Sequence, residues 1–168
     1  MSVARNRHIN LKMLPKILAQ YELELSRSFH GMEHWERVYR IGVRLSNLTG
    51  ADSAVVANFA LLHDACRHDE GSDPHHGPRA ALFAEKHRKL IKLDDDSFDV
   101  LVEAICGHTN GKTSEYITIG TCWDSDRLDI GRVGVIPDKR TLSTDEAKKD
   151  EFFKWATMLH EEKESYDE

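Results

Sequence analysis

The chain has 168 residues, of which 40% are hydrophobic and 31% are charged, a composition typical of one globular domain. Its formal net charge of −6 argues against electrostatic binding to a nucleic-acid polymer or to an anionic membrane surface. No apolar run approaches the ~20 residues of a membrane span, and none follows the N-terminus as in a signal peptide. The three cysteines are irregularly spaced and do not suggest a disulfide framework. We therefore expect a cytoplasmic protein.

Apolar residues recur mostly at three- and four-residue spacing, and two-residue alternation is nearly absent. This pattern predicts an all-α fold. The helices are expected over about 11–29, 34–48, 52–65, 79–90, 94–105, 121–130 and 143–160. Gly50 is a predicted helix stop, Asp52 a predicted N-cap, and Ser143 with Glu146 a predicted capping box.

We interpret residues 1–168 as a single domain. The residues that carry chemistry lie between about 30 and 130, and residues 131–168 form a connection and a C-terminal helix. The polar stretch over 107–120 follows no clear period, so it receives no assignment.

Several ionisable side chains are in phase with the apolar stripes of these helices and therefore point inward. They are His34, His63, Asp64, His76, His108 and Asp126. A single one would be a core histidine bonded to a carbonyl, but burying six such groups is costly unless they bind a cation. Mixed nitrogen and oxygen ligands suit Fe, Mn, Co, Ni or Zn, and the absence of CxxC pairs argues against a structural zinc site.

Five segments, in this order, resemble the HD-domain superfamily of metal-dependent phosphohydrolases. They are His30–Val38, Leu61–Asp64, His75–Pro78, Ile105–Thr109 and Asp124–Asp129. The resemblance covers about residues 30–130 and implies an HD-type helical fold. The segments around His75 and Ile105 resemble the two additional histidines of the binuclear members of the superfamily.

The resemblance implies a ligand set for one or two divalent transition-metal ions. One ion would be held by His34, His63, Asp64 and Asp126, and a second by His76 and His108, with Asp64 bridging the two. Two positions stay open, because His75 can replace His76 and Asp124 can replace Asp126.

Basic residues near these ligands are candidates for binding a substrate phosphate. Arg67 follows the His-Asp pair, where relatives often carry lysine or glycine, and either neutralises a phosphate or forms a surface ion pair. Arg37 and Arg127 lie within a turn of proposed ligands and either orient carboxylates or contact substrate. Lys112 is a further phosphate-binding candidate.

The resemblance implies hydrolysis of a phosphoester or phosphoanhydride in a small metabolite or nucleotide, with Asp64 and Arg67 as catalytic residues. A metal-activated water would attack phosphorus. Two alternatives remain. Some members of the superfamily use the same six ligands in a mixed-valent di-iron oxygenase, and a non-catalytic domain that binds metal or nucleotide would also keep them. The sequence leaves the oligomeric state open.

Overall fold

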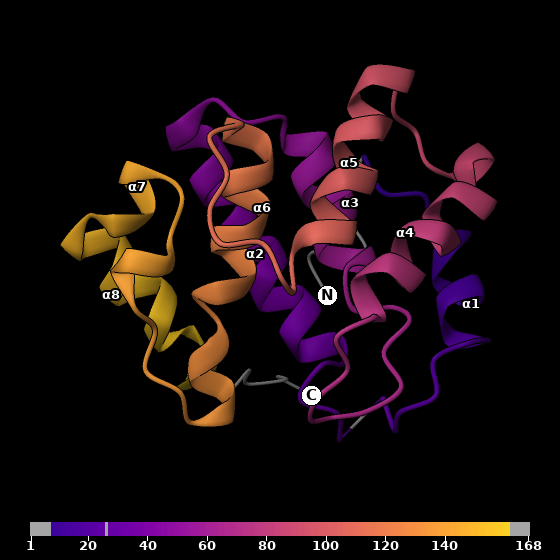
Figure 1. The fold of residues 1–168 in the computed structure, drawn as a ribbon, viewed down its shortest axis with the longest axis horizontal. Helices are drawn as coiled ribbons and strands as arrows, with labels where there is room; N and C mark the ends of the chain where they lie inside the picture. Colours follow the sequence, from indigo (N-terminus) through magenta and orange to yellow (C-terminus); the bar gives the residue numbers. More distant parts are fainter. Residues whose placement is uncertain (1–7, 26, 162–168) are drawn as a thin grey trace, which may run out of the picture.

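The computed structural model describes residues 8–25 and 27–161, and within these ranges every regular element is helical (Figure 1). The α-helices are α1 (Met13–Leu18), α2 (Met32–Thr49), α3 (Ser53–Leu62), α4 (His76–Lys86), α5 (Asp95–Gly107), α6 (Ile117–Arg127), α7 (Asp145–Lys148) and α8 (Asp150–Met158). Short 3-10 helices are η2 (Arg88–Leu90), η3 (Ile130–Val133), η4 (Lys139–Thr141) and η5 (Leu159–Glu161). The predicted all-α fold is confirmed. None of the helices in these ranges has the length and apolarity needed to cross a membrane.

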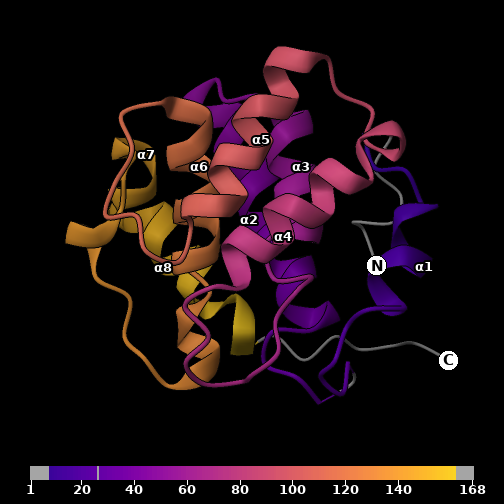
Figure 2. The ribbon, with the colours of Figure 1, turned by 45° about the vertical axis from the view of Figure 1, so that its right-hand side comes forward.

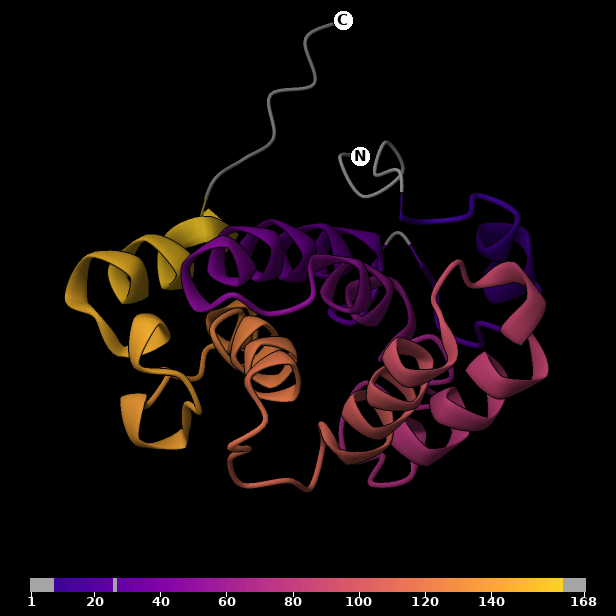
Figure 3. The ribbon, with the colours of Figure 1, turned by 90° about the horizontal axis from the view of Figure 1, so that it is seen from above.

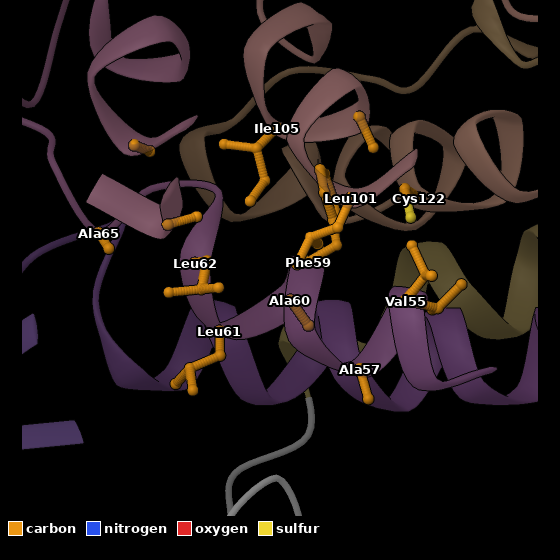
Figure 4. Close-up of a cluster of buried hydrophobic side chains, with 14 of the residues drawn as sticks. Val55, Ala57, Phe59, Ala60, Leu61, Leu62, Ala65, Leu101, Ile105 and Cys122 are labelled. Carbon is orange, nitrogen blue, oxygen red and sulfur yellow. The ribbon is translucent and has the colours of Figure 1, made fainter. Parts of the chain in front are cut away.

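Helix α3 lies at the centre of the larger hydrophobic core. Every residue from Val55 to Leu62 is buried, so this helix is covered on all sides rather than on one stripe. Helices α2, α5 and α6 pack around it (Figure 3). Figure 4 shows side chains of α3 meeting Leu101 and Ile105 of α5 and Cys122 of α6. The residue that follows α3 therefore emerges inside the protein.

A second, smaller cluster joins the C-terminal helices to the other side of α2 (Figure 3). Ile41 and Leu45 of α2 pack there with Phe152 and Ala156 of α8. Residues 131–161 thus fold onto the motif-bearing core as part of the same domain.

The helix ends that the sequence specifies most clearly are those around the α2–α3 turn. Gly50 ends α2 with a φ of 77°, a left-handed conformation that glycine adopts without steric cost. The side chain of Asp52 accepts hydrogen bonds from the backbone N–H groups of Ala54 and Val55 at the start of α3. Both predicted signals are confirmed.

The helix predicted over 11–29 is wrong, because α1 ends at Leu18. The chain instead turns back along α2, where the ring of Tyr21 packs edge-on against Trp35 and its hydroxyl bonds to Ser28. A Cβ on Gly31 would collide with the backbone oxygen of Leu25, so only glycine allows the close approach in this turn.

Other helices differ from their predicted bounds. Helix α4 begins at His76 and ends at Lys86, before the predicted 79–90, and α6 begins at Ile117, inside the stretch that received no assignment. The single C-terminal helix predicted from a Ser143 cap is wrong, because two helices meet at an extended residue, Lys149, and Thr144 caps the first of them.

Candidate metal centre

Helices α2 to α6 pack against one another (Figure 2). Six inward-facing side chains from these helices and from the residues that follow them lie together. His34 lies in the first turn of α2, His76 begins α4, and Asp126 lies in the last turn of α6. His63 and His108 are the C-caps of α3 and α5. Asp64 follows the α3 cap, and all but Asp126, whose side chain is 20% exposed, are buried. The structure thus brings together every residue predicted as a metal ligand.

The first group of potential ligands consists of His34, His63 and Asp126. The Nε2 atoms of the two histidines are 3.0 Å apart. The Asp126 Oδ1 atom lies 3.3 Å from Nε2 of His34 and 3.7 Å from Nε2 of His63. Three ligand atoms from three helices therefore face one point.

The second group consists of Asp64, His76 and His108. The Nε2 atoms of its histidines are 2.8 Å apart, and Asp64 Oδ1 lies 3.0 Å from that of His76 and 3.6 Å from that of His108. The other oxygen of Asp64, Oδ2, lies 3.6 Å from Nε2 of His34. One carboxylate thus presents one oxygen to each group.

Hydrogen bonds on the far side of the four imidazoles fix their tautomers. Each Nδ1 faces an oxygen that carries no hydrogen, so it must be the donor. The acceptors are Asp129 Oδ2 for His34, Phe59 O for His63, Asp73 O for His76 and Ile105 O for His108. In the neutral rings every Nε2 is then an unprotonated acceptor turned toward the other ligands, an arrangement characteristic of metal-binding histidines.

The surroundings shift the pKa values of several of these groups. Burial lowers the pKa of His63 from 6.5 to about 3. Burial raises the pKa of Asp64, but the imidazoles around it, His63 first among them, favour the charged carboxylate and bring the value well below 3.8. Burial also raises the pKa of Asp126, but the imidazoles of His34, His63 and His108 together favour its charged form and lower the pKa. Burial lowers the pKa of His108, but the Asp64 carboxylate, 3.6 Å from its Nε2, favours the protonated ring and outweighs burial, so the pKa is raised.

The structure separates the two pairs of alternative ligands. His76 is buried in the second group, whereas His75 is exposed. Asp124 is buried away from the groups and accepts hydrogen bonds from the backbone of Ser143 and of Thr144 and from the Thr144 hydroxyl. Its role is to hold the segment before α7, and Asp126 is the aspartate beside the histidines.

Two residues beside the centre were not singled out in the sequence. Asp129 is fully buried and accepts the Nδ1 hydrogen of His34 at 2.7 Å. His30 Nδ1 lies 2.9 Å from Asp64 Oδ2 and belongs to a further possible ligand group with His34. The sequence contained one signal for Asp129: it follows Asp126 by three residues and so lies on the same side of the chain.

The predicted phosphate-binding residues lie in different places. Arg67 is buried and lines a cavity of about 410 Å³ that opens onto Asp64, His76, His108 and Asp126. Arg127 lines this cavity too, but its guanidinium donates to backbone carbonyls of Gly111, Lys112 and Thr141.

Two further predicted residues lie outside this cavity. Arg37 donates from Nε to Asp129 Oδ1 at 2.7 Å and lines a separate cavity of about 640 Å³. Lys112 is exposed and is not part of the cavity wall. Of the four predicted basic residues, Arg67 is therefore the one whose buried charge faces the cluster.

Comparison with known proteins adds no relative: the chain matches no family model, no curated protein and no solved structure. The geometry itself is suited to metal. Two pairs of unprotonated nitrogens facing each other at about hydrogen-bond distance repel unless a cation or a proton lies between them, and the carboxylates beside them supply the compensating charge.

Proposed function

We propose that this chain has an HD-type fold and is a metal-dependent phosphohydrolase acting on a small phosphorylated metabolite or nucleotide. The all-helical domain and its buried His/Asp cluster are compatible with that fold. The observation that carries the proposal is the orientation of four buried imidazoles. All four donate from Nδ1 to the protein and leave Nε2 facing a shared carboxylate.

The residues that would hold metal are the six that the sequence singles out. His34, His63 and Asp126 would bind one ion, His76 and His108 a second, and Asp64 both. Two divalent ions there would orient and activate a water for attack on phosphorus. Fe, Mn, Co, Ni and Zn all accept this mixture of imidazole and carboxylate ligands.

The chain's own residues then account for binding and charge. Arg67 is held by hydrogen bonds from Nε to the Asp69 carbonyl and from Nη2 to the Gly71 carbonyl. Its Nη1 lies 3.7 Å from Asp64 Oδ1, so its charge stands beside the shared carboxylate. A guanidinium fixed in this way offsets charge that develops on phosphoryl oxygens without having to reorganise.

Hydrolysis in this site breaks the bond between phosphorus and the leaving-group oxygen. The attacking water supplies the new oxygen on phosphorus and loses its proton, and the departing oxygen takes up a proton. The low pKa values of Asp64 and Asp126 keep both carboxylates charged, so they can hold cations through this exchange rather than give up protons themselves.

The test is phosphate release from a panel of phosphomonoesters, diesters and anhydrides by protein purified without chelator and supplied with Mn²⁺ or Co²⁺. We expect release that chelation abolishes, and no oxygen consumption with reduced iron. Oxygen uptake without phosphate release would instead identify an oxygenase. Metal that raises the melting temperature without any turnover would identify a regulatory domain.

A further inference from the structure

The cavity above the cluster contains a second buried guanidinium that comes from outside the motif-bearing core. Arg132 lies in η3, and its side chain is only 8% exposed. It lines the same cavity as Arg67. We infer that Arg67 and Arg132 together form an anion subsite for a terminal phosphoryl group, so that the ligand is a small phosphomonoester. This inference rests on the proposed function.

The two arginines stand on either side of Asp64. On one side, Arg67 Nη1 lies 3.7 Å from Asp64 Oδ1. On the other side, Asp64 Oδ2 lies 2.9 Å from His30 Nδ1, and that nitrogen lies 3.1 Å from Arg132 Nη2. A ligand seated over the shared carboxylate therefore has a guanidinium on each flank.

Two backbone oxygens hold Arg132, and its Nη1 also lies 3.8 Å from Asp129 Oδ2. Nε donates to the Phe29 carbonyl at 2.8 Å, and Nη1 donates to the Asp129 carbonyl at 3.1 Å. Within the described part of the chain, these bonds use the single hydrogen of Nε and one of the two on Nη1. Nη2 lies 3.1 Å from His30 Nδ1, which accepts a hydrogen from it only when that nitrogen does not donate to Asp64. Nη1 and Nη2 each keep a second N–H, as needed to bind two oxygens of one anion.

The balance of formal charge in the cavity favours an anion. Its wall contains three arginines, Arg67, Arg127 and Arg132, and three carboxylates, Asp64, Glu70 and Asp126. These charges cancel, so the charge of any bound cations is left for the ligand to neutralise. A phosphomonoester carries two negative charges near neutral pH, whereas a diester carries one.

The number of oxygens points the same way. A terminal phosphoryl group has three non-bridging oxygens, enough for a guanidinium on each flank and for the cluster below. An internal phosphodiester has two. The cavity volume of about 410 Å³ lies near the lower end of the range for small-molecule sites, and Ile130 and Val133 provide an apolar wall for the organic part.

The test is calorimetric binding of inorganic phosphate and of dimethyl phosphate to the protein with its purified metal content. We expect phosphate to bind at least about tenfold more tightly than dimethyl phosphate, and Arg132→Met to weaken phosphate binding about 10- to 100-fold. Arg132→Lys keeps the positive charge but loses the two-pronged donor geometry of the guanidinium, and should weaken phosphate binding by a smaller factor. Arg140→Met, at an exposed arginine paired with Asp138, is the control and should bind phosphate as the wild type does.

Arg37→Met separates the subsite from an indirect effect. Arg37 also bonds to Asp129 but lines the other cavity. Equal weakening by Arg37→Met and Arg132→Met would overturn the inference, as would equal affinity for the two phosphates. If Arg132→Met does not fold, unchanged phosphate affinity in Arg132→Lys overturns it instead. Binding needs no turnover, so a protein that binds phosphate through Arg132 but hydrolyses nothing would fail the proposed function alone.

Discussion

The two ligand groups of the centre are supported in different ways. In the first group, His34 donates to the side chain of Asp129, which Arg37 holds from the other side. In the second group, His76 and His108 both donate to backbone carbonyls. A carboxylate acceptor makes an imidazole more basic than a carbonyl does, and a side chain can be replaced without moving the backbone. A single substitution at Asp129, which is not itself in the ligand group, can therefore change the metal affinity of the first group.

The second group depends instead on the close approach of two helices. A Cβ on Gly77 would lie 2.8 Å from the Ile105 carbonyl oxygen and 3.0 Å from that of Cys106. Backbone contact between α4 and α5 at this glycine brings His76 next to His108. The position of this group is thus fixed by backbone packing, and that of the first group by side-chain bonds as well.

The largest effect is expected from replacing the residue that the two groups share. Asp64→Asn removes the charge that faces both of them, so we expect metal content to fall for both groups together. The loss in metal affinity should exceed the ~10–100-fold typical of losing a residue that merely supports a ligand. Metal analysis after dialysis, with phosphate release as a second readout, measures it. Loss of metal from one group alone would show that Asp64 does not bridge.

Single-ligand variants should separate the groups. His34→Ala removes a ligand from the first group, and His108→Ala removes one from the second. We expect each variant to lose about one equivalent of metal and to keep the other. His75→Ala, at the exposed neighbour of His76, is the matched control and should keep the full content. A wild-type content of one equivalent would contradict the two-group arrangement and leave His76 and His108 as contacts to substrate or to a ligand.

Much of this centre could be predicted from the sequence because helical periodicity reports which way a side chain points. His34, His63 and Asp126 are in phase with apolar stripes, and those stripes are buried in the structure. Periodicity says less about where a helix ends. The apolar spacing after Leu18 continues, but packing of Tyr21 on Trp35 competes with it and turns the chain back.

The supporting residues were harder to predict, since their partners are distant in the chain. Asp129 and His34 are 95 positions apart, and Arg132 and His30 are 102 apart. No local period reports such pairs. The sequence could not decide between Asp124 and Asp126 for the same reason. The hydrogen bonds that Asp124 accepts come from residues 143 and 144, which lie beyond the helix.

The smallest expected effect, and the sharpest test of the difference between the groups, comes from Asp129→Asn. An amide still accepts the Nδ1 hydrogen of His34 but carries no charge, so the imidazole becomes less basic. We expect metal affinity of the first group to fall about 10–100-fold, with the second group unchanged. Competition with a chelator of known affinity, monitored by metal analysis, resolves the two steps.

Asp124→Asn is the matched control, because Asp124 is equally buried and close in sequence but bonds to the segment before α7. It should lower the melting temperature without changing metal affinity, since its hydrogen bonds are structural. Weakening of both groups by Asp129→Asn, or equal weakening by the two variants, would mean that stability alone sets metal affinity. A loss of metal affinity confined to the first group would mean that the charge of Asp129 acts through His34. Support by a side chain would then differ from support by backbone carbonyls, as in the second group.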